Sequence, residues 1–511
     1  HHFSAPAPTS ATAHIANLCV ADYDRLDAFY DPVSCHRLNN LKEAESDPAH
    51  IRPDQIIFSI RFPHPGLTMT RWFQFIATSI RLEIEYLPEY HYETDPETKE
   101  SPTFTFDARM AYRTATNGTW EKLAEARENR SLVCHFTKSQ SGADDGFYNC
   151  EEIPFFEIGS VHYEEYLVNI RLPAKHWNNK IGKISEFNFV EIHQNGGFTK
   201  MWFTIKTIVG PISIIILIWF VKRVKSLSRD PMLLEKALFA LGVTTAFMNF
   251  PFEWLTLWLN MPFMLLFSDI RQGLFYGMLM CFWIIFTGEH LVDRPERNRL
   301  KTYWRQIGAI GFGCLSLLVF DLCERGYQLH NPFYTIWATK LGSKLAYAFI
   351  IFAAVCASLY FLFLCIMIFR VFWNIRGKRA AVPTMSRARQ LQYQGLIYRF
   401  EFLMVVTVLC AGLTVVFFII SNVNEAQWKF GDEESTVEIS SALFTGIYGM
   451  WNTYVFAVVF LYAPSRSVPA TDNPEEHERL ELRSRTEVRL TEGEAAEESV
   501  IYQFTGKTAR E

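Results

Sequence analysis

Ionisable residues that lie within or near long apolar stretches are the first candidates for chemistry in this sequence. A charge at the centre of a bilayer costs at least about 2.5 kcal/mol, so these groups should face a bundle interior, a cavity or an interface. A proton or ion pathway needs charges through the midplane, and only Glu253 and Asp321 come near it. The pattern therefore favours pairing inside a bundle, or exposure at an interface, over transport. The residues concerned are Glu253, Asp269, Arg271, Glu289, His290, Asp321, Glu324 and Arg325.

Signatures of catalysis are missing from the sequence. HExxH, GxSxG, GxGxxG after a strand and a Walker A motif are absent, and Ile501 stands where a P-loop at 501–508 would need its first glycine. No cluster of Asp, Glu or His in the polar N-terminal half has the spacing of metal ligands. A membrane acyltransferase would need a catalytic histidine in the membrane, and His290 sits at the edge of an apolar stretch. We expect neither an enzyme nor a cofactor.

The candidate residues belong to seven apolar stretches, each of about 20 residues or more, which is enough to cross a hydrocarbon core of roughly 30 Å. The loops after the first, third and fifth stretches are rich in Lys and Arg, so the positive-inside rule places them in the cytoplasm. An odd number of spans then puts residues 1–200 on the lumenal or extracellular side. Pro251 predicts a kink in the second stretch. The stretches are 203–222, 233–258, 270–291, 305–325, 345–372, 396–420 and 440–463.

The N-terminal half alternates apolar and polar residues with the period of a β-strand, and turn signals separate the runs. Short strands at regular spacing indicate an antiparallel β-sandwich or barrel. One short helix is predicted at 120–128. The predicted strands are 55–62, 73–86, 103–112, 164–172 and 184–192.

Four of the ten cysteines lie in this half, and an even number on an oxidising side predicts two disulfides. Three connectivities are possible. Local pairing, Cys19–Cys35 and Cys134–Cys150, closes two short loops and is preferred. Two N-glycosylation sequons fall in the same half, at Asn117 and Asn129.

The third basic loop contains Tyr393 and Leu396 in a Tyr-x-x-Leu pattern, the form that clathrin adaptors bind as an extended peptide. Leu396 could instead simply begin the next helix. The tail, 466–511, is rich in charged residues and predicts disorder. The net charge of -5 gives no indication of nucleic-acid binding, because the basic residues cluster at membrane edges.

Several ordered strings are specific enough to point to a family. One is WFQF at 72–75 in the earlier half. The later strings are HQNGGFTK at 193–200, DIRQG at 269–273, FWIIFTGEH at 282–290, DLCERG at 321–326, NPFY at 331–334, LYFLFLC at 359–365, GIYGMW at 446–451 and FLYAPS at 460–465. Together they resemble the Wntless (Evi) family, the cargo receptors for secreted Wnt proteins, and the resemblance is densest from about residue 150 to 465.

The resemblance implies a multi-pass α-helical membrane protein. It would have a lumenal antiparallel β-sandwich at 1–200, a GPCR-like seven-helix bundle at 201–465 and a disordered cytoplasmic tail at 466–511. The family has eight transmembrane helices, and the chain starts at His1 without Met, so we expect a first helix to be missing. Members bind palmitoleoylated Wnt proteins, escort them from the endoplasmic reticulum through the Golgi to the plasma membrane, and return through endosomes by clathrin adaptors and retromer. Membrane lipids are the other expected partners.

The resemblance also implies functional residues. Tyr393 and Leu396 match the family's endocytic motif, and Lys507, Ala509 and Glu511 match its retrieval signal for the endoplasmic reticulum. Aromatic residues and glycines concentrate in three stretches, 270–291, 305–325 and 345–372, where we expect the groove for the acyl chain. The residues assigned to this groove are Phe275, Tyr276, Leu279, Phe282, Phe312, Leu315, Phe349 and Phe352.

A seven-helix signalling receptor for an extracellular ligand is the alternative. It would need an Asp-Arg-Tyr pattern at the end of its third helix and Asn-Pro-x-x-Tyr in its seventh. The corresponding positions read GEH at 288–290 and NTY at 452–454, so the cargo receptor is favoured.

Overall fold

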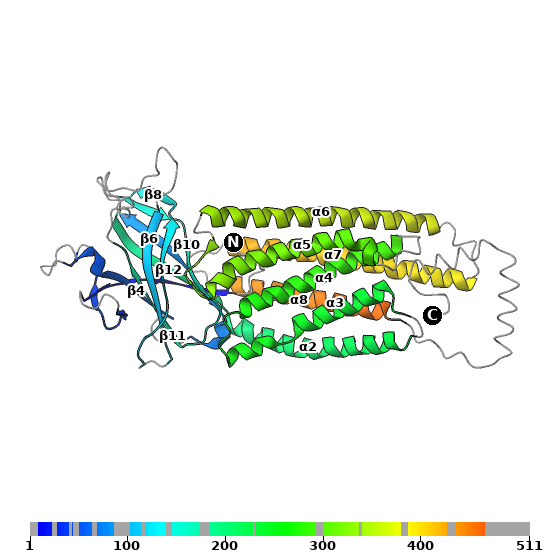
Figure 1. The fold of residues 1–511 in the computed structure, drawn as a ribbon, viewed down its shortest axis with the longest axis horizontal. Coiled ribbons are helices and arrows are strands. Elements are labelled where there is room, and N and C mark those ends of the chain that lie inside the picture. Colours follow the sequence, from blue (N-terminus) through cyan, green and yellow to red (C-terminus); the bar gives the residue numbers. More distant parts are fainter. Residues whose placement is uncertain are drawn as a thin grey trace.

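A β-sandwich stands at one end of a bundle of seven long helices (Figure 1). The computed structural model describes residues 9–22, 28–39, 43, 51–63, 69–85, 103–114, 118–138, 146–173, 183–227, 230–291, 300–336, 340–379, 387–426 and 435–464.

The first sheet of the sandwich is antiparallel and has β5 (Ile76–Glu85) at its centre. The side chains of β5 alternate strictly between buried and half-buried, as its period-two sequence predicts. β10 (Ile153–Ile158) also pairs with β5. The remaining order is β1 (Thr9–Ile15), β12 (Lys183–Gln194), β5, β9 (Gly146–Cys150) and β8 (Cys134–Lys138).

The second sheet is also antiparallel, and a shared apolar core lies between the two sheets. Phenylalanine rings dominate this core: Phe62 and Phe189, one from each sheet, are fully buried. The predicted sandwich is therefore confirmed. The strand order is β3 (His36–Leu38), β2 (Asn17–Val20), β4 (Ile56–Phe62), β11 (Glu165–Arg171), β6 (Thr103–Arg113) and β7 (Glu121–Ser131).

The helix predicted at 120–128 is wrong, because all of these residues except Trp120 belong to the edge strand β7. Glu, Lys, Ala and Arg favour helices, but the preference is weak and tertiary pairing overrides it. Here β7 pairs with β6 along its length, and the charged side chains match across the strands. Arg109 donates to Glu125 at 3.0 Å, and Arg127 donates to Asp107. The charged edge also discourages pairing with another chain.

In the part of the chain that the structure describes, seven long helices follow. All seven, α3 together with the 3₁₀ segment after it, are long and apolar enough to cross a membrane, so the chain is a multi-pass membrane protein. β12 continues almost directly into the first, where the Asn195 side chain accepts a hydrogen bond from Phe198 N and caps the helix. The helices are α2 (Gly196–Lys225), α3 (Leu233–Asn249), α4 (Met264–Leu291), α5 (Trp304–Asp321), α6 (Lys340–Arg379), α7 (Arg387–Ala426) and α8 (Ser435–Tyr462).

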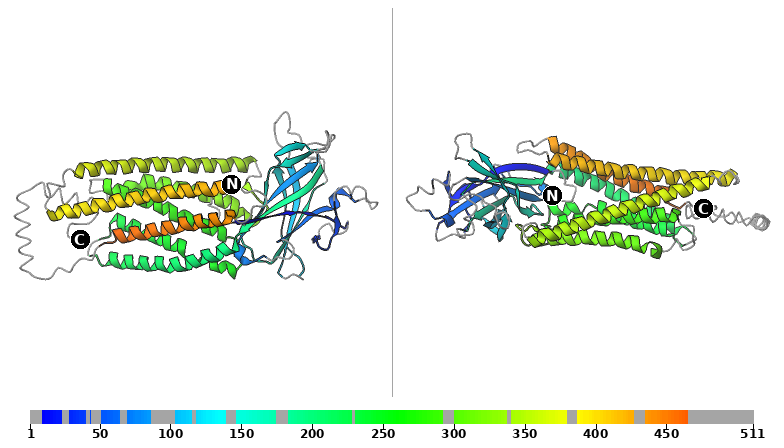
Figure 2. Two further views of the ribbon diagram at one scale, coloured as in Figure 1. Left: turned by 180° about the vertical axis from the view of Figure 1, so that it is seen from behind. Right: turned by 90° about the horizontal axis from the view of Figure 1, so that it is seen from above.

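The helices differ in how far they enter the bundle. α3 packs on α2, α4 and α8, whereas α6 contacts α5 and α4 and runs along one edge (Figures 1 and 2). In the most apolar 18 residues of each span, 56% of the residues are buried for α3 and only 6% for α6. Ile310 is the one buried residue of α5 among those described. The apolar surface that the protein leaves uncovered is therefore concentrated on α5 and α6.

Candidate functional site

The residues assigned to an acyl groove divide into two sets. Phe275, Leu279 and Phe282 of α4 are at most 1% exposed and belong to the bundle core. Phe286, one turn beyond Phe282, stacks on Phe400 of α7 with ring centroids 5.4 Å apart. This part of α4 therefore holds the bundle together.

The other assigned residues face outward or meet between α5 and α6. Phe312 of α5 and Phe352 of α6 form an edge-to-face pair with centroids 5.4 Å apart, and Phe320 and Phe349 form another at 6.4 Å. Phe312 remains 62% exposed. Aromatic and aliphatic side chains thus form an uncovered apolar face on these two helices. Its further exposed members are Leu315 of α5 and Leu345, Ile351, Val355 and Leu359 of α6. The remaining assigned residue, Tyr276, is exposed on α4.

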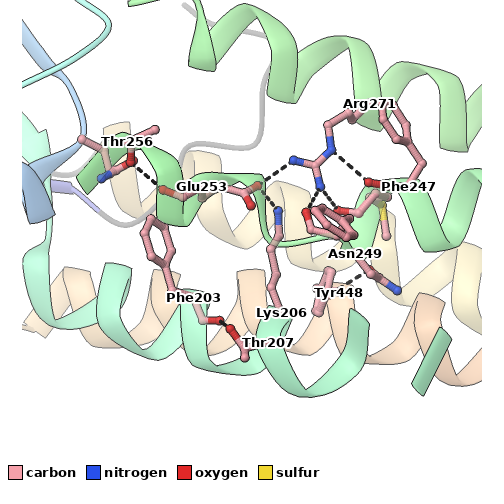
Figure 3. Close-up of polar contacts among 12 residues, drawn as sticks. Phe203, Lys206, Thr207, Phe247, Asn249, Glu253, Thr256, Arg271 and Tyr448 are labelled. Carbon is pink, nitrogen blue, oxygen red and sulfur yellow. Dashed lines mark hydrogen bonds and ion pairs between the residues drawn. The ribbon is translucent and has the colours of Figure 1, made fainter. Parts of the chain in front are cut away.

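A buried group of three charges, which sequence reasoning found only in part, joins α2, α4 and the segment after α3 (Figure 3). Glu253 accepts from Lys206 and, at 3.0 Å, from Nη1 of Arg271. All three residues are at most 7% exposed. Glu253 and Arg271 are two of the residues for which pairing inside the bundle was one expectation, and they pair with each other. Lys206, inside the first apolar stretch, was overlooked. The signal for this group in the sequence was a lysine inside a stretch of otherwise mostly apolar residues.

Pro251 explains why Arg271 is held there. The predicted kink is instead a helix end: α3 stops at Asn249, and the 3₁₀ segment Phe252–Leu257 follows. A helix end leaves carbonyl groups without intrahelical partners. The Arg271 guanidinium donates to three of them, the carbonyls of Phe247, Met248 and Phe250. The arginine thus caps a broken helix and neutralises the carboxylate beside it.

Neutral polar groups join the helices deeper in the bundle. Asn249 donates to Ser213 of α2 at 2.8 Å and to Asn452 of α8 at 2.5 Å, and it accepts from the Tyr448 hydroxyl at 2.8 Å (Figure 3 labels Asn249 and Tyr448). Buried polar groups gain stability when their hydrogen bonds are made, so this cluster fixes α2, α3 and α8 together.

The sandwich contacts the bundle through residues 71–74. Arg71 donates to the Leu257 carbonyl at 2.6 Å, and Thr256 donates to Gln74 at 3.0 Å. The Trp72 ring lies 5.9 Å from Phe203 and 6.1 Å from Trp254. WFQF at 72–75 is therefore part of a domain contact.

Two cavities lie near the sandwich. One, of about 160 Å³, opens between the sandwich and the helix ends and is lined by Glu157, Tyr163, Asn260 and Arg325, among others. Arg325 also pairs with Asp269 at 3.3 Å, a second case of the predicted charge pairing. Another, of about 360 Å³, lies on the second sheet and is lined mainly by charged side chains, including Asp107, Arg109, Glu125, Arg127 and Arg171. Among the described residues no group of three His, Cys, Asp or Glu could hold a metal ion.

The remaining predicted residues are placed as follows. Disulfides join Cys19 to Cys35 and Cys134 to Cys150, the local pairing. Asn129 is exposed on β7, and Asn117 lies outside the described residues.

Tyr393 and Leu396 lie within the first turns of α7, so the peptide is helical there rather than extended. Lys507, Ala509 and Glu511 lie outside the described residues.

Comparison with known proteins accounts for both parts of the chain. Residues 21–194 match the family description "Wntless, GOLD domain", and residues 195–466 match "Wntless-like, transmembrane domain". The mouse and human proteins called "Protein wntless homolog" are 45% and 44% identical over 520 residues, which cover 99% of this chain and 94% of each relative. "Protein wntless" of Drosophila virilis is 43% identical over 84% of this chain and 78% of its own length. The chain therefore belongs to the Wntless family, and this membership supports a role in Wnt secretion.

Proposed function

We propose that this protein is a cargo receptor that binds palmitoleoylated Wnt proteins and escorts them from the endoplasmic reticulum through the Golgi to the cell surface. The β-sandwich, about residues 1–200, would lie in the lumen and hold the protein part of the cargo. The bundle, about residues 201–465, would hold the acyl chain. The tail, 466–511, would lie in the cytoplasm.

The uncovered apolar face of α5 and α6 is the observation that carries this proposal. Both helices leave most of their apolar surface outside the bundle core, and the Phe312–Phe352 pair lies between them. Such a face offers an acyl chain a surface of rings and aliphatic side chains. It is also continuous with the bilayer, since it is the outer side of two spanning helices.

The energetics of lipid transfer favour this arrangement. Burying a chain of roughly 15 CH₂ groups at ~0.8 kcal/mol each contributes on the order of 10 kcal/mol. An acylated protein without a carrier would therefore stay on the nearest membrane. Moving the chain between the bilayer and a helical face exchanges one apolar environment for another, so the transfer is nearly neutral and release remains possible.

Sorting would use the basic loop and the tail. We propose that a clathrin adaptor binds Tyr393 and Leu396 and that retromer returns the protein from endosomes. Adaptor binding requires an extended peptide, so about the first three turns of α7 must unwind when it occurs. Helix ends fray readily, which makes this possible. Lys507, Ala509 and Glu511 would direct retrieval to the endoplasmic reticulum.

The test is co-purification of the full chain with a Wnt protein and with the same Wnt carrying Ala at its acylated serine. Recovery of the acylated form should be far higher. Equal recovery of both forms would contradict a lipid-binding role for the bundle.

A further inference from the structure

The loop between α5 and α6 inserts an aromatic ring into the core of the sandwich. Phe333 is fully buried, and its ring centroid lies 5.5 Å from that of Phe155 and 6.0 Å from that of Phe156, both on β10. It belongs to the same apolar cluster as the residues of the two sheets. One residue from the membrane half of the chain is thus a member of the sandwich core.

Hydrogen bonds from strands of both sheets hold this loop on the sandwich. The Arg130 guanidinium, on β7 and 2% exposed, donates to the Phe333 carbonyl at 2.5 Å. Glu157 N donates to the Pro332 carbonyl at 3.0 Å, and the Asn331 amide donates to Glu128 at 2.9 Å. The Asn331 side chain also accepts from Phe333 N at 3.1 Å, a local hydrogen bond that stabilises the turn.

The two helices that this loop connects bury few of their residues against the rest of the bundle. Ile310 is the one buried residue of α5 among those described, and in the most apolar stretch of α6 only 6% of the residues are buried. The Tyr360 hydroxyl donates to the Met280 carbonyl of α4 at 3.2 Å, near the middle of α6. At the end of the bundle nearest the sandwich, the loop that carries Phe333 is therefore a major attachment of the α5–α6 hairpin to the rest of the protein.

We propose that Phe333 is a positioning residue for cargo: it fastens the α5–α6 hairpin to the sandwich, so that the protein part and the acyl chain of one cargo are bound cooperatively. This inference rests on the proposed function. A rigid attachment keeps the apolar face at a fixed distance from the domain that holds the protein, which raises the effective concentration of the acyl chain at that face. Without the attachment, cargo binding must also order the hairpin.

The binding test compares affinities of the full chain for palmitoleoylated Wnt and for the Wnt with Ala at the acylated serine. Phe333→Ala should lower the ratio of the two affinities at least about 5-fold, the lower end of typical coupling between sites. Phe333→Leu, which still fills the core, should largely restore the ratio. Phe58→Ala is the matched control, since Phe58 is 3% exposed in the same core and its ring neighbour is Phe187 at 4.2 Å.

The outcomes separate the two claims. A wild-type protein without preference for acylated Wnt would overturn the proposed function. A wild-type preference that Phe333→Ala leaves unchanged would overturn the positioning role alone. An equal fall of the affinity ratio in Phe58→Ala would also overturn the positioning role, because any damage to the sandwich core would then be enough to lower the ratio.

A second measurement needs no cargo. Spin labels at Leu123 on β7 and Leu341 on α6, both exposed, report the distance between the sandwich and the hairpin. Labels should be introduced as unnatural amino acids, because the described residues include six free cysteines. Asn331→Ala, which leaves the core filled, should broaden this distance distribution but not that between Leu123 and Ile208 of α2. Unchanged distributions for both Asn331→Ala and Phe333→Ala would refute the attachment.

Discussion

Arg271 and Glu253 form an ion pair 3.0 Å apart inside the bundle, although they come from different spans. Lys206 of α2 contacts the same carboxylate oxygen. Two cations and one carboxylate are thus removed from water at the end of α3 nearest the sandwich. A buried pair contributes little compared with apolar packing, but removing one partner leaves an uncompensated charge.

Glu253→Gln should therefore destabilise the protein by about 3–5 kcal/mol, because it leaves Lys206 and Arg271 buried without a counter-charge. The glutamine amide keeps the shape of the side chain, so the loss of stability measures the effect of the missing charge rather than of altered packing. Thermal unfolding of the solubilised protein measures it. Glu164→Gln, at an exposed position, is the control and should change nothing. A Glu253→Gln protein with unchanged melting temperature would argue against a structural role for the three charges.

Glu165 makes the sandwich sensitive to acid. Its carboxylate is 2% exposed; burial raises its pKa, but hydrogen bonds from Arg113 and Arg61 outweigh this and bring the pKa below its ordinary 4.5. A carboxyl whose pKa is lower in the folded state stabilises it above the unfolded value and loses this effect as the pH falls. Stability should therefore be level near neutral pH and fall below about pH 4.5. Glu165→Gln should weaken this acid dependence; an unchanged pH profile would contradict the assignment.

The period-two pattern predicted β5 and the sandwich, because one-sided burial is a local property of a strand. It failed for β7, where helix-favouring residues form a strand through cross-strand charge pairs with β6. Lys206 and Phe333 were missed for a related reason. Their partners lie 47 residues away at Glu253 and nearly 180 residues away at Phe155 and Phe156, and nothing local specifies such contacts.

The outer face of α5 and α6 can be tested by paired substitutions. Phe312→Ala with Phe352→Ala should lower the affinity for palmitoleoylated Wnt about 10-fold or more, a loss of roughly 1.4 kcal/mol or more. Affinity for the Wnt with Ala at the acylated serine should stay the same, because no acyl chain contacts the rings. Phe369→Ala is the matched control, since it is 67% exposed on the same helix but farther along it. Equal losses for both forms of Wnt would contradict the assignment.

Tyr393→Ala should raise the amount of protein at the cell surface, because uptake through the adaptor slows. Leu396→Ala should have the same effect. Surface biotinylation measures the change. Tyr398→Ala provides the control, since Tyr398 lies on the same helix, is 63% exposed and is outside the motif. Unchanged surface levels for Tyr393→Ala, or an equal rise for Tyr398→Ala, would refute an endocytic role for this motif.

Photo-crosslinking can show where on the helical bundle the acyl chain binds. A Wnt carrying a palmitoleate analogue with a diazirine in its acyl chain is bound to the full chain, irradiated, and the attached peptides are mapped by mass spectrometry. The label should appear on peptides from 304–321 of α5 and 340–379 of α6, concentrated near Phe312 and Phe352. Labelling confined to lipid, or to helices other than α5 and α6, would contradict the claim that this face holds the acyl chain.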